Sequence, residues 1–207
     1  MTNIEWNFYD RQLPSLESRR NLPHIEMRGA LTFVTFRLGD SMPQQVVERW
    51  HEAVDEWMTA NNLTGRSVDE VLESSFVTHQ LKDELRRFKN RRRHGHLDDC
   101  HGACVLKNRD LREFVSQSLL CFNGDRYDLE RFVIMPNHVH VLIQMRDEFL
   151  LRKTFREIQR YSARQINQHS DRSGELWQGE PFDHIVRNES QFEYLQRYID
   201  ENPVKAR

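Results

Sequence analysis

Residues 131–145 read RFVIMPNHVHVLIQM, two strand-like apolar runs on either side of a proline. Both runs are rich in β-branched and aromatic residues, which favour extended backbone. Because Pro136 cannot donate a hydrogen bond to a sheet ladder, we expect it at a strand start or at a bulge. The stretch therefore predicts two strands that are interrupted near Met135-Pro136-Asn137.

Within the second run, two histidines lie two residues apart. Side chains at alternate positions of a strand project to the same face, so His138 and His140 stand side by side while Val139 and Val141 point into the core. Imidazole nitrogens are common metal donors, and two of them on one rigid strand can hold a divalent ion with open positions for a substrate. The competing interpretation is a polar outer face of the strand.

The segments around this stretch alternate between strand and helix periodicity. GALTFVTFRL at residues 29–38 predicts a strand, and Ser67 with Glu70 forms the pattern of a helix-capping box. Residues 1–28 are polar, without a sustained period, and we expect an arm leading to the domain. Helices are predicted at 43–59, at 67–89 with a break near Ser74-Ser75, and at 110–120, 147–168 and 189–200, the last stopped by Asn202-Pro203.

Length and composition indicate a folded protein with one main domain. The chain has 207 residues, 30% of them charged and 38% hydrophobic, which allows a sizeable core. Three cysteines, the lack of an apolar leader and the lack of an apolar run of about 20 residues favour a reducing cytoplasm and no membrane association. The net charge of −2 is unusual for a general nucleic-acid binder, so the distribution of charge must decide.

Four ordered motifs carry a resemblance to a known family. They are MPNHVHVLI (135–143), YSARQIN (161–167), GELWQGEPFD (174–183) and YIDENPVKA (198–206). Together they resemble the REP-associated tyrosine transposases, relatives of insertion-sequence transposases with one catalytic tyrosine and a histidine–hydrophobic–histidine (HUH) motif. The resemblance runs from about Gly29 to the C-terminus and is strongest over 131–206.

This resemblance implies both a fold and a cofactor. The fold is a ferredoxin-like α+β HUH transposase domain, with a central antiparallel sheet flanked by helices and a helical insertion. We accordingly expect the arm at 1–28 and the transposase-like domain at 29–207, with the helical and basic insertion at about 61–108. His138 and His140 match the HUH motif, which implies bound Mg²⁺ or Mn²⁺.

The resemblance also implies a tyrosine nucleophile on a helix after the histidine strand. There the helix offers Tyr161, with Gln165 one turn later on the same side as a third metal ligand. The phenolate would attack the scissile phosphate and become linked to the 5′ phosphate. Tyr194 and Tyr198 are weaker candidates, which we interpret as packing residues, and packing is also an alternative for Tyr161.

Two basic clusters predict contacts with phosphates. Arginines recur every four residues along the 147–168 helix and make one basic ribbon, whose alternative is a solvated face paired with Glu157. A second cluster precedes His94. The predicted DNA-binding residues are Arg152, Arg156, Arg160 and Arg164 of the ribbon, and Arg91, Arg92 and Arg93 of the second cluster.

The segment after the second cluster contains further metal-binding residue types. His94, His96, Cys100, His101 and Cys104 are compatible with structural zinc, but their spacing is not that of a standard pair of zinc knuckles. A plain loop is the favoured interpretation.

These observations lead to one main function and two alternatives. The main one is a metal-dependent transposase or endonuclease that cleaves and rejoins single-stranded or hairpin DNA through a covalent 5′-phosphotyrosine, as a monomer or homodimer. A domesticated relative that binds hairpin DNA without cutting it is the first alternative. The second is a metal-dependent hydrolase that activates water and leaves no covalent adduct.

Overall fold

The computed structural model describes residues 4–19 and 23–205 and divides into two compact units. One unit contains residues 1–41 and 103–207, and the other contains Met42–Gly102. The first unit carries the histidine strand, and the second is helical. Among the described residues, no helix combines the length and the apolarity that a membrane span requires.

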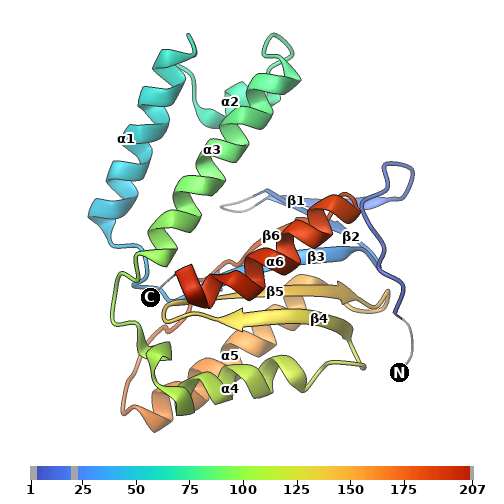
Figure 1. The fold of residues 1–207 in the computed structure, drawn as a ribbon, viewed down its shortest axis with the longest axis vertical. Helices are drawn as coiled ribbons and strands as arrows, with labels where there is room; N and C mark the ends of the chain where they lie inside the picture. The colour runs from blue at the N-terminus through green and yellow to red at the C-terminus, as the bar shows by residue number, and fades with distance from the viewer. Residues whose placement is uncertain (1–3, 20–22, 206–207) are drawn as a thin grey trace. The chain divides into compact units, whose positions relative to one another are not determined.

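A four-stranded antiparallel sheet forms the centre of the first unit (Figure 1). Its strands lie in the order β4-β5-β3-β6. With the two helices that connect them, they follow the β-α-β-β-α-β order of a ferredoxin-like fold, so the predicted fold class is confirmed. The strands are β3 (Leu31–Arg37), β4 (Tyr127–Ile134), β5 (His138–Met145) and β6 (Phe182–Ile185).

Both crossover helices pack against the same face of this sheet. Helix α4 (Arg109–Leu120) connects β3 to β4, and α5 (Leu151–His169) connects β5 to β6. Val139 and Val141 of β5 share one hydrophobic core with residues of α4 and α5. Figure 1 shows the two helices side by side below the sheet.

Helix α6 (Glu189–Lys205) covers the opposite face. Its Leu195 and Ile199 form a second core with Leu142 of β5 and with Leu31 and Phe33 of β3. The helix continues through Pro203 to Lys205, so the predicted stop at Asn202-Pro203 was wrong. A proline in the last turn removes one intrahelical hydrogen bond, which a helix that packs on a sheet can tolerate.

The N-terminal segment adds two features to this unit. Asn7 lies beside β3, where Leu31 N donates to Asn7 O over 2.7 Å. Trp6 and Phe8 pack against the second core. A two-stranded antiparallel sheet of β1 (Ser15–Arg19) and β2 (Pro23–Met27) follows.

The helical unit contains α1 (Gln44–Ala60), α2 (Val68–Glu73) and α3 (His79–Asp98). The predicted capping box is present, because Ser67 Oγ accepts from Glu70 N and Ser67 N donates to Glu70 Oε2. The predicted break between α2 and α3 is present as well. A core that includes Val54, Val71 and Leu85 holds the three helices together.

Candidate functional site

The histidine pair of β5 is fully buried on the sheet face that α6 covers. The Nε2 atoms of His138 and His140 lie 3.0 Å apart, and their ring planes are inclined by 74°. The prediction that both imidazoles converge on one point is therefore confirmed by the geometry. The alternative of a solvent-exposed polar face is wrong, since both side chains have zero exposure.

Neighbouring side chains fix the orientation of both rings. Asn137 Oδ1 lies 2.8 Å from His138 Nδ1, and Thr35 Oγ1 lies 2.8 Å from His140 Nδ1. An amide oxygen only accepts hydrogen bonds, so the His138 proton lies on Nδ1 and its Nε2 carries a lone pair. Phe33 stacks on the His140 ring at a centroid distance of 5.3 Å. Such contacts on the distal nitrogen are what orients histidine ligands in metal sites.

The pair has the geometry that a shared divalent ion requires. Two nitrogens bound to one ion at about 2.1 Å and at a right angle lie about 3.0 Å apart. The observed separation of the two Nε2 atoms is 3.0 Å. The separation of the two nitrogens is therefore compatible with one shared divalent ion.

Tyr198 of α6 lies next to this pair. Its hydroxyl is 3.3 Å from His140 Nε2, and the two rings meet edge to face at a centroid distance of 5.2 Å. Phe33 contacts both rings. A phenol, the two imidazoles and the sheet thus form one cluster, and the phenol comes from the C-terminal helix.

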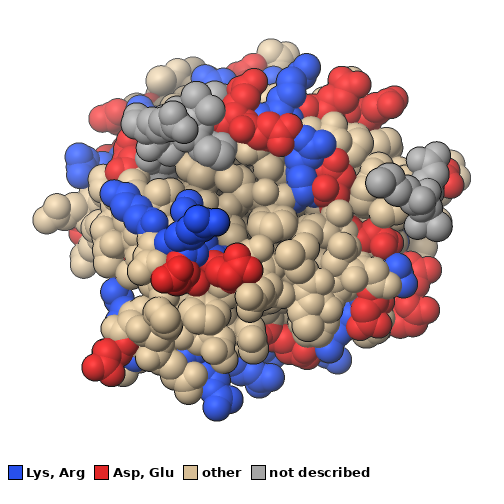
Figure 2. All heavy atoms as spheres, turned by 60° about the horizontal axis from the view of Figure 1, so that its bottom comes forward, with Lys and Arg blue, Asp and Glu red and all other residues tan. Residues whose placement is uncertain are grey.

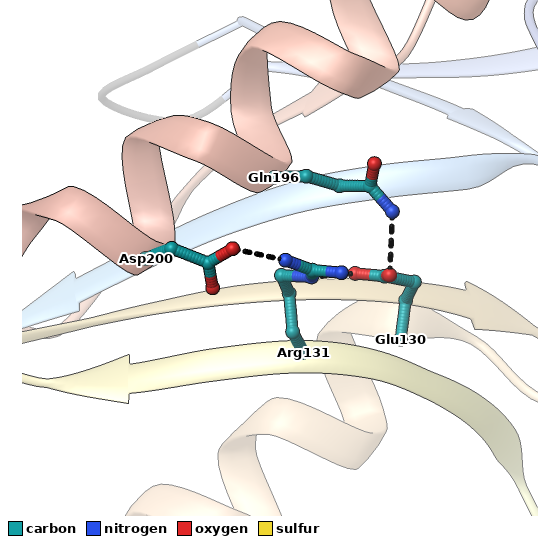
Figure 3. A network of polar contacts seen from close by, with 4 residues as sticks. All are labelled: Glu130, Arg131, Gln196 and Asp200. Atoms are coloured by element: carbon teal, nitrogen blue, oxygen red, sulfur yellow. Dashed lines mark hydrogen bonds and ion pairs between the residues drawn. The ribbon is translucent and has the colours of Figure 1, made fainter.

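A polar network holds α6 in place over β4 (Figure 3). Arg131 of β4 bonds to its neighbour Glu130 and forms an ion pair with Asp200 of α6. Gln196 Nε2 donates to Glu130 Oε1 over 2.7 Å. Two points of α6, one on either side of Tyr198 in the sequence, are therefore tied to the sheet, which fixes where the phenol lies.

Asn202 is the next residue along the same side of α6. Helix α6 runs antiparallel to β5 (Figure 1), and four helical residues advance about 6 Å, close to the advance of two strand residues. Because Tyr198 lies beside His140, we expect Asn202 to lie alongside His138. The Asn202 side chain is 1% exposed, and neither polar atom of its amide has a hydrogen-bond partner in the described part of the chain.

A buried amide without partners is costly unless it binds something. The amide oxygen is a suitable ligand for a hard divalent ion. It could therefore act as a third ligand of an ion that the two histidines hold. We therefore expect Asn202→Ala to weaken Mn²⁺ binding by about 10- to 100-fold, as measured by isothermal titration calorimetry. The metal-free variant should change in stability by less than about 1 kcal/mol, because no hydrogen bond is lost.

Ser162→Ala is the matched control for this prediction. Ser162 is also buried, but its hydroxyl accepts from Trp177 Nε1 and donates to Ile158 O on the opposite face of the sheet. This variant should lose about 1–3 kcal/mol of stability in urea titrations and keep its Mn²⁺ affinity. Unchanged Mn²⁺ affinity in Asn202→Ala would show that the amide is not a ligand.

The structure does not bring Tyr161 and Gln165 to the histidine pair. Both lie on α5, whose buried residues pack on the Val139 and Val141 face of β5, and the sheet separates them from the histidines. The Tyr161 side chain is 48% exposed. The structure therefore does not bring these two predicted residues to the pair, and the tyrosine that lies there is Tyr198.

The basic ribbon lies on α5 as predicted. Arg156, Arg160 and Arg164 are exposed, and Arg152 is half-buried. Glu157, the predicted competing partner, pairs instead with Arg126 over 2.7 Å. No ribbon arginine forms an ion pair within the described residues. Figure 2 shows the basic side chains of one face of the molecule in separate groups, with acidic side chains interspersed.

The second basic cluster lies on α3 in the helical unit. Arg91 and Arg92 are exposed and line a cavity of about 360 Å³ together with Phe88 and His96, while the Arg93 side chain lies outside the described residues. Of the residues considered for zinc, His96 and His101 come together. Their ligand atoms and that of Asp99 lie within 4.8 Å of one another.

Residues 105–202 match the family described as "Transposase IS200 like". This segment includes the histidine pair, Tyr198 and Asn202, and it covers just under half of the chain. This part of the chain is therefore similar to the IS200-like transposases.

Solved structures of such proteins resemble the chain at low sequence identity. One is a REP-associated tyrosine transposase bound to a REP hairpin, with 14% identity over 92% of this chain and 74% of that chain, and a TM-score of 0.46. Another, described as a candidate transposase from Deinococcus radiodurans R1, has 13% identity over 90% of this chain and 98% of that chain, with a TM-score of 0.34. No curated protein sequence matches the chain.

Proposed function

We propose that this protein, which is similar to IS200-like transposases over residues 105–202, cleaves and rejoins single-stranded or hairpin DNA through a covalent bond between Tyr198 and a 5′ phosphate. His138, His140 and Asn202 would hold a Mg²⁺ or Mn²⁺ ion beside this tyrosine. The observation that carries the proposal is the 3.3 Å approach of the Tyr198 hydroxyl to His140 Nε2. The REP-associated branch of the family, which the sequence motifs resemble, supports a hairpin as the DNA partner.

The reaction is a transesterification at phosphorus. The Tyr198 oxygen forms a bond to the scissile phosphorus, and the bond between phosphorus and the 3′ oxygen breaks. The phenol loses its proton to solvent, and the departing 3′ oxygen takes one up. When bound, the divalent ion would polarise the phosphate and offset its negative charge. Rejoining is the reverse attack of a 3′ hydroxyl on the phosphotyrosine.

Several residues of the chain would hold the reacting groups in place. Thr35 and Asn137 hold the imidazole rings, and the bonds from Glu130 and Arg131 hold α6. The histidine pair is completely buried under α6, which carries the proposed nucleophile.

The direct test is capture of the covalent adduct. A pool of DNA hairpins with randomised single-stranded flanks, labelled at the 3′ end, is incubated with the protein and Mn²⁺. The mixture is then separated on a denaturing gel. A labelled protein band supports the proposal, since the fragment with the 5′ phosphate carries the label. Cleaved DNA without labelled protein would indicate hydrolysis by water, and binding without cleavage would indicate a non-cleaving hairpin-binding protein.

We further propose that the α5 ribbon binds backbone phosphates away from the cleavage site. Arg156, Arg160 and Arg164 are exposed and have no ion-pair partner in the described chain. Each phosphate contact contributes about 0.9 to the slope of log affinity against log salt concentration. Replacing all three by alanine should therefore lower that slope by up to about 2.7, as measured by fluorescence anisotropy with a DNA hairpin.

Arg146→Ala is the control for the ribbon variant. Arg146 is also an exposed arginine of the first unit, but it is paired with Asp128 over 3.1 Å. Its removal should leave the salt dependence close to that of the unmodified protein. An unchanged slope in the triple variant would exclude the ribbon from DNA binding.

A further inference from the structure

Arg37 is the last residue of β3 and lies directly across from His138 of β5. Directly opposite residues of antiparallel strands project to the same face, so the Arg37 side chain leaves the sheet on the side of the histidine pair. The same register places Thr35 opposite His140. The Arg37 side chain therefore starts on the histidine face of the sheet, next to His138 in the register of the two strands.

This guanidinium has an unusual environment for a half-buried cation. Its Nη1 donates to Ser41 Oγ over 3.0 Å, and the buried Ser41 hydroxyl in turn donates to Leu38 O over 2.7 Å. No carboxylate pairs with Arg37 in the described part of the chain. By contrast, two other partly buried arginines of this unit, Arg126 and Arg131, have acidic partners. These pairs are Arg126–Glu157 and Arg131–Glu130.

Burial lowers the pKa of Arg37, and no acidic neighbour offsets this shift. A cation that is partly removed from water is costly without an anionic partner. The single bond to Ser41 fixes the direction of the side chain and uses only one of its five N–H groups. The planar guanidinium fork matches two oxygens of one phosphate. An anion beside the histidine pair would therefore complete the site.

We propose that Arg37 binds the non-bridging oxygens of the phosphate that reacts at the histidine pair. This inference rests on the proposed function and adds a phosphate-binding residue from β3, outside the segment that matches the family. Ser41 acts as a positioning residue, since it holds the guanidinium and contacts no substrate.

The first test uses inorganic phosphate and needs no DNA. Mn²⁺ bound at the pair accelerates the ³¹P relaxation of phosphate held nearby, and the effect falls steeply with distance. In Arg37→Ala the acceleration at a given phosphate concentration should fall by about tenfold or more, which corresponds to the loss of a charge-assisted hydrogen bond. Arg37→Lys keeps the positive charge but lacks the planar fork of the guanidinium. The acceleration of relaxation in this variant should lie between that of the unmodified protein and that of Arg37→Ala.

Two controls make this result specific. Arg146 lies next to the other end of β5 and is paired with Asp128. In Arg146→Ala the acceleration of ³¹P relaxation should equal that in the unmodified protein. A His138→Ala, His140→Ala double variant should lose the effect because it loses the ion. Unchanged Mn²⁺ affinity in Arg37→Ala, measured by calorimetry, shows that the histidine site is intact. Relaxation that persists in Arg37→Ala, or that is absent from the unmodified protein, would overturn the proposal.

Cleavage of hairpin DNA provides the second measurement. Arg37→Ala should cleave about 10²- to 10³-fold more slowly, because the phosphate gains negative charge on these oxygens as the tyrosine attacks. A phosphate effect without cleavage by the unmodified protein would refute the nuclease function and leave the phosphate site standing. Cleavage by the unmodified protein that Arg37→Ala leaves unchanged would refute the role of Arg37 alone.

Discussion

Replacing Tyr198 by phenylalanine is expected to abolish both DNA cleavage and the covalent protein–DNA adduct. The change removes only the hydroxyl, which lies 3.3 Å from His140 Nε2. Without that oxygen no phosphotyrosine can form, so the cleavage rate should fall on the order of 10⁴-fold or more. The measurement is the labelled adduct on a denaturing gel, with initial rates of hairpin cleavage at saturating Mn²⁺.

Tyr161→Phe is the matched control for this variant. It makes the same chemical change on α5, at a side chain that is 48% exposed and lies across the sheet from the histidines. Its cleavage rate should stay within about threefold of the unmodified protein, the usual range for an exposed substitution. If Tyr161→Phe abolishes the adduct and Tyr198→Phe does not, the nucleophile assigned from the structure is wrong.

The sequence prediction placed Tyr161 near the histidine pair, whereas the structure places it across the sheet. The order of the strands and helices explains this difference. In a β-α-β-β-α-β fold, both crossovers are right-handed and therefore place both helices on one face of the sheet. Val139 and Val141 must face these helices, since they are the apolar side of β5. His138 and His140 then face away from α5 and from every residue on it. The alternation of β5 thus excludes Tyr161 once the order of the elements is known.

The C-terminal motif contains the two residues that we propose as nucleophile and third ligand. The motif YIDENPVKA contains both Tyr198 and Asn202, four residues apart on one side of a helix. A predicted stop at Pro203 left Asn202 outside the helix and removed this signal. The orphaned amide of Asn202 and the approach of Tyr198 to His140 depend on how α6 packs across the sheet, and periodicity does not determine that packing.

Other parts of the fold followed directly from local patterns. The capping box at Ser67, the strand around Phe33 and the strand pair on either side of Pro136 are determined by short-range preferences. The face on which each helix lies is a long-range property, because it depends on strand order. The position of Arg37 could not be predicted from the sequence for the same reason. Arg37 and His138 are far apart in the sequence and lie opposite each other only because β3 and β5 pair.

His140→Ala is expected to eliminate Mn²⁺ binding at the pair and to reduce cleavage on the order of 10³-fold or more. In the unmodified protein the two Nε2 atoms lie 3.0 Å apart. The variant removes one imidazole, so only the His138 nitrogen remains to bind the ion. An ion held by one imidazole and one amide is bound weakly, and loss of the ion removes the several kcal/mol of charge stabilisation that it would give to the reacting phosphate. Calorimetric Mn²⁺ titration and hairpin cleavage rates measure the two effects.

Thr35→Val gives the graded comparison that separates metal binding from folding. Valine has nearly the shape of threonine but lacks the Oγ1 that lies 2.8 Å from His140 Nδ1. The ring keeps its Nε2 donor and loses the contact that orients it, so Mn²⁺ affinity should fall by about 10- to 100-fold. Because the ion acts on the phosphate through both histidines, cleavage at limiting Mn²⁺ should fall in parallel and recover at saturating Mn²⁺. Cleavage in Thr35→Val that does not recover with added Mn²⁺ would place the defect in the fold of the sheet rather than in metal binding.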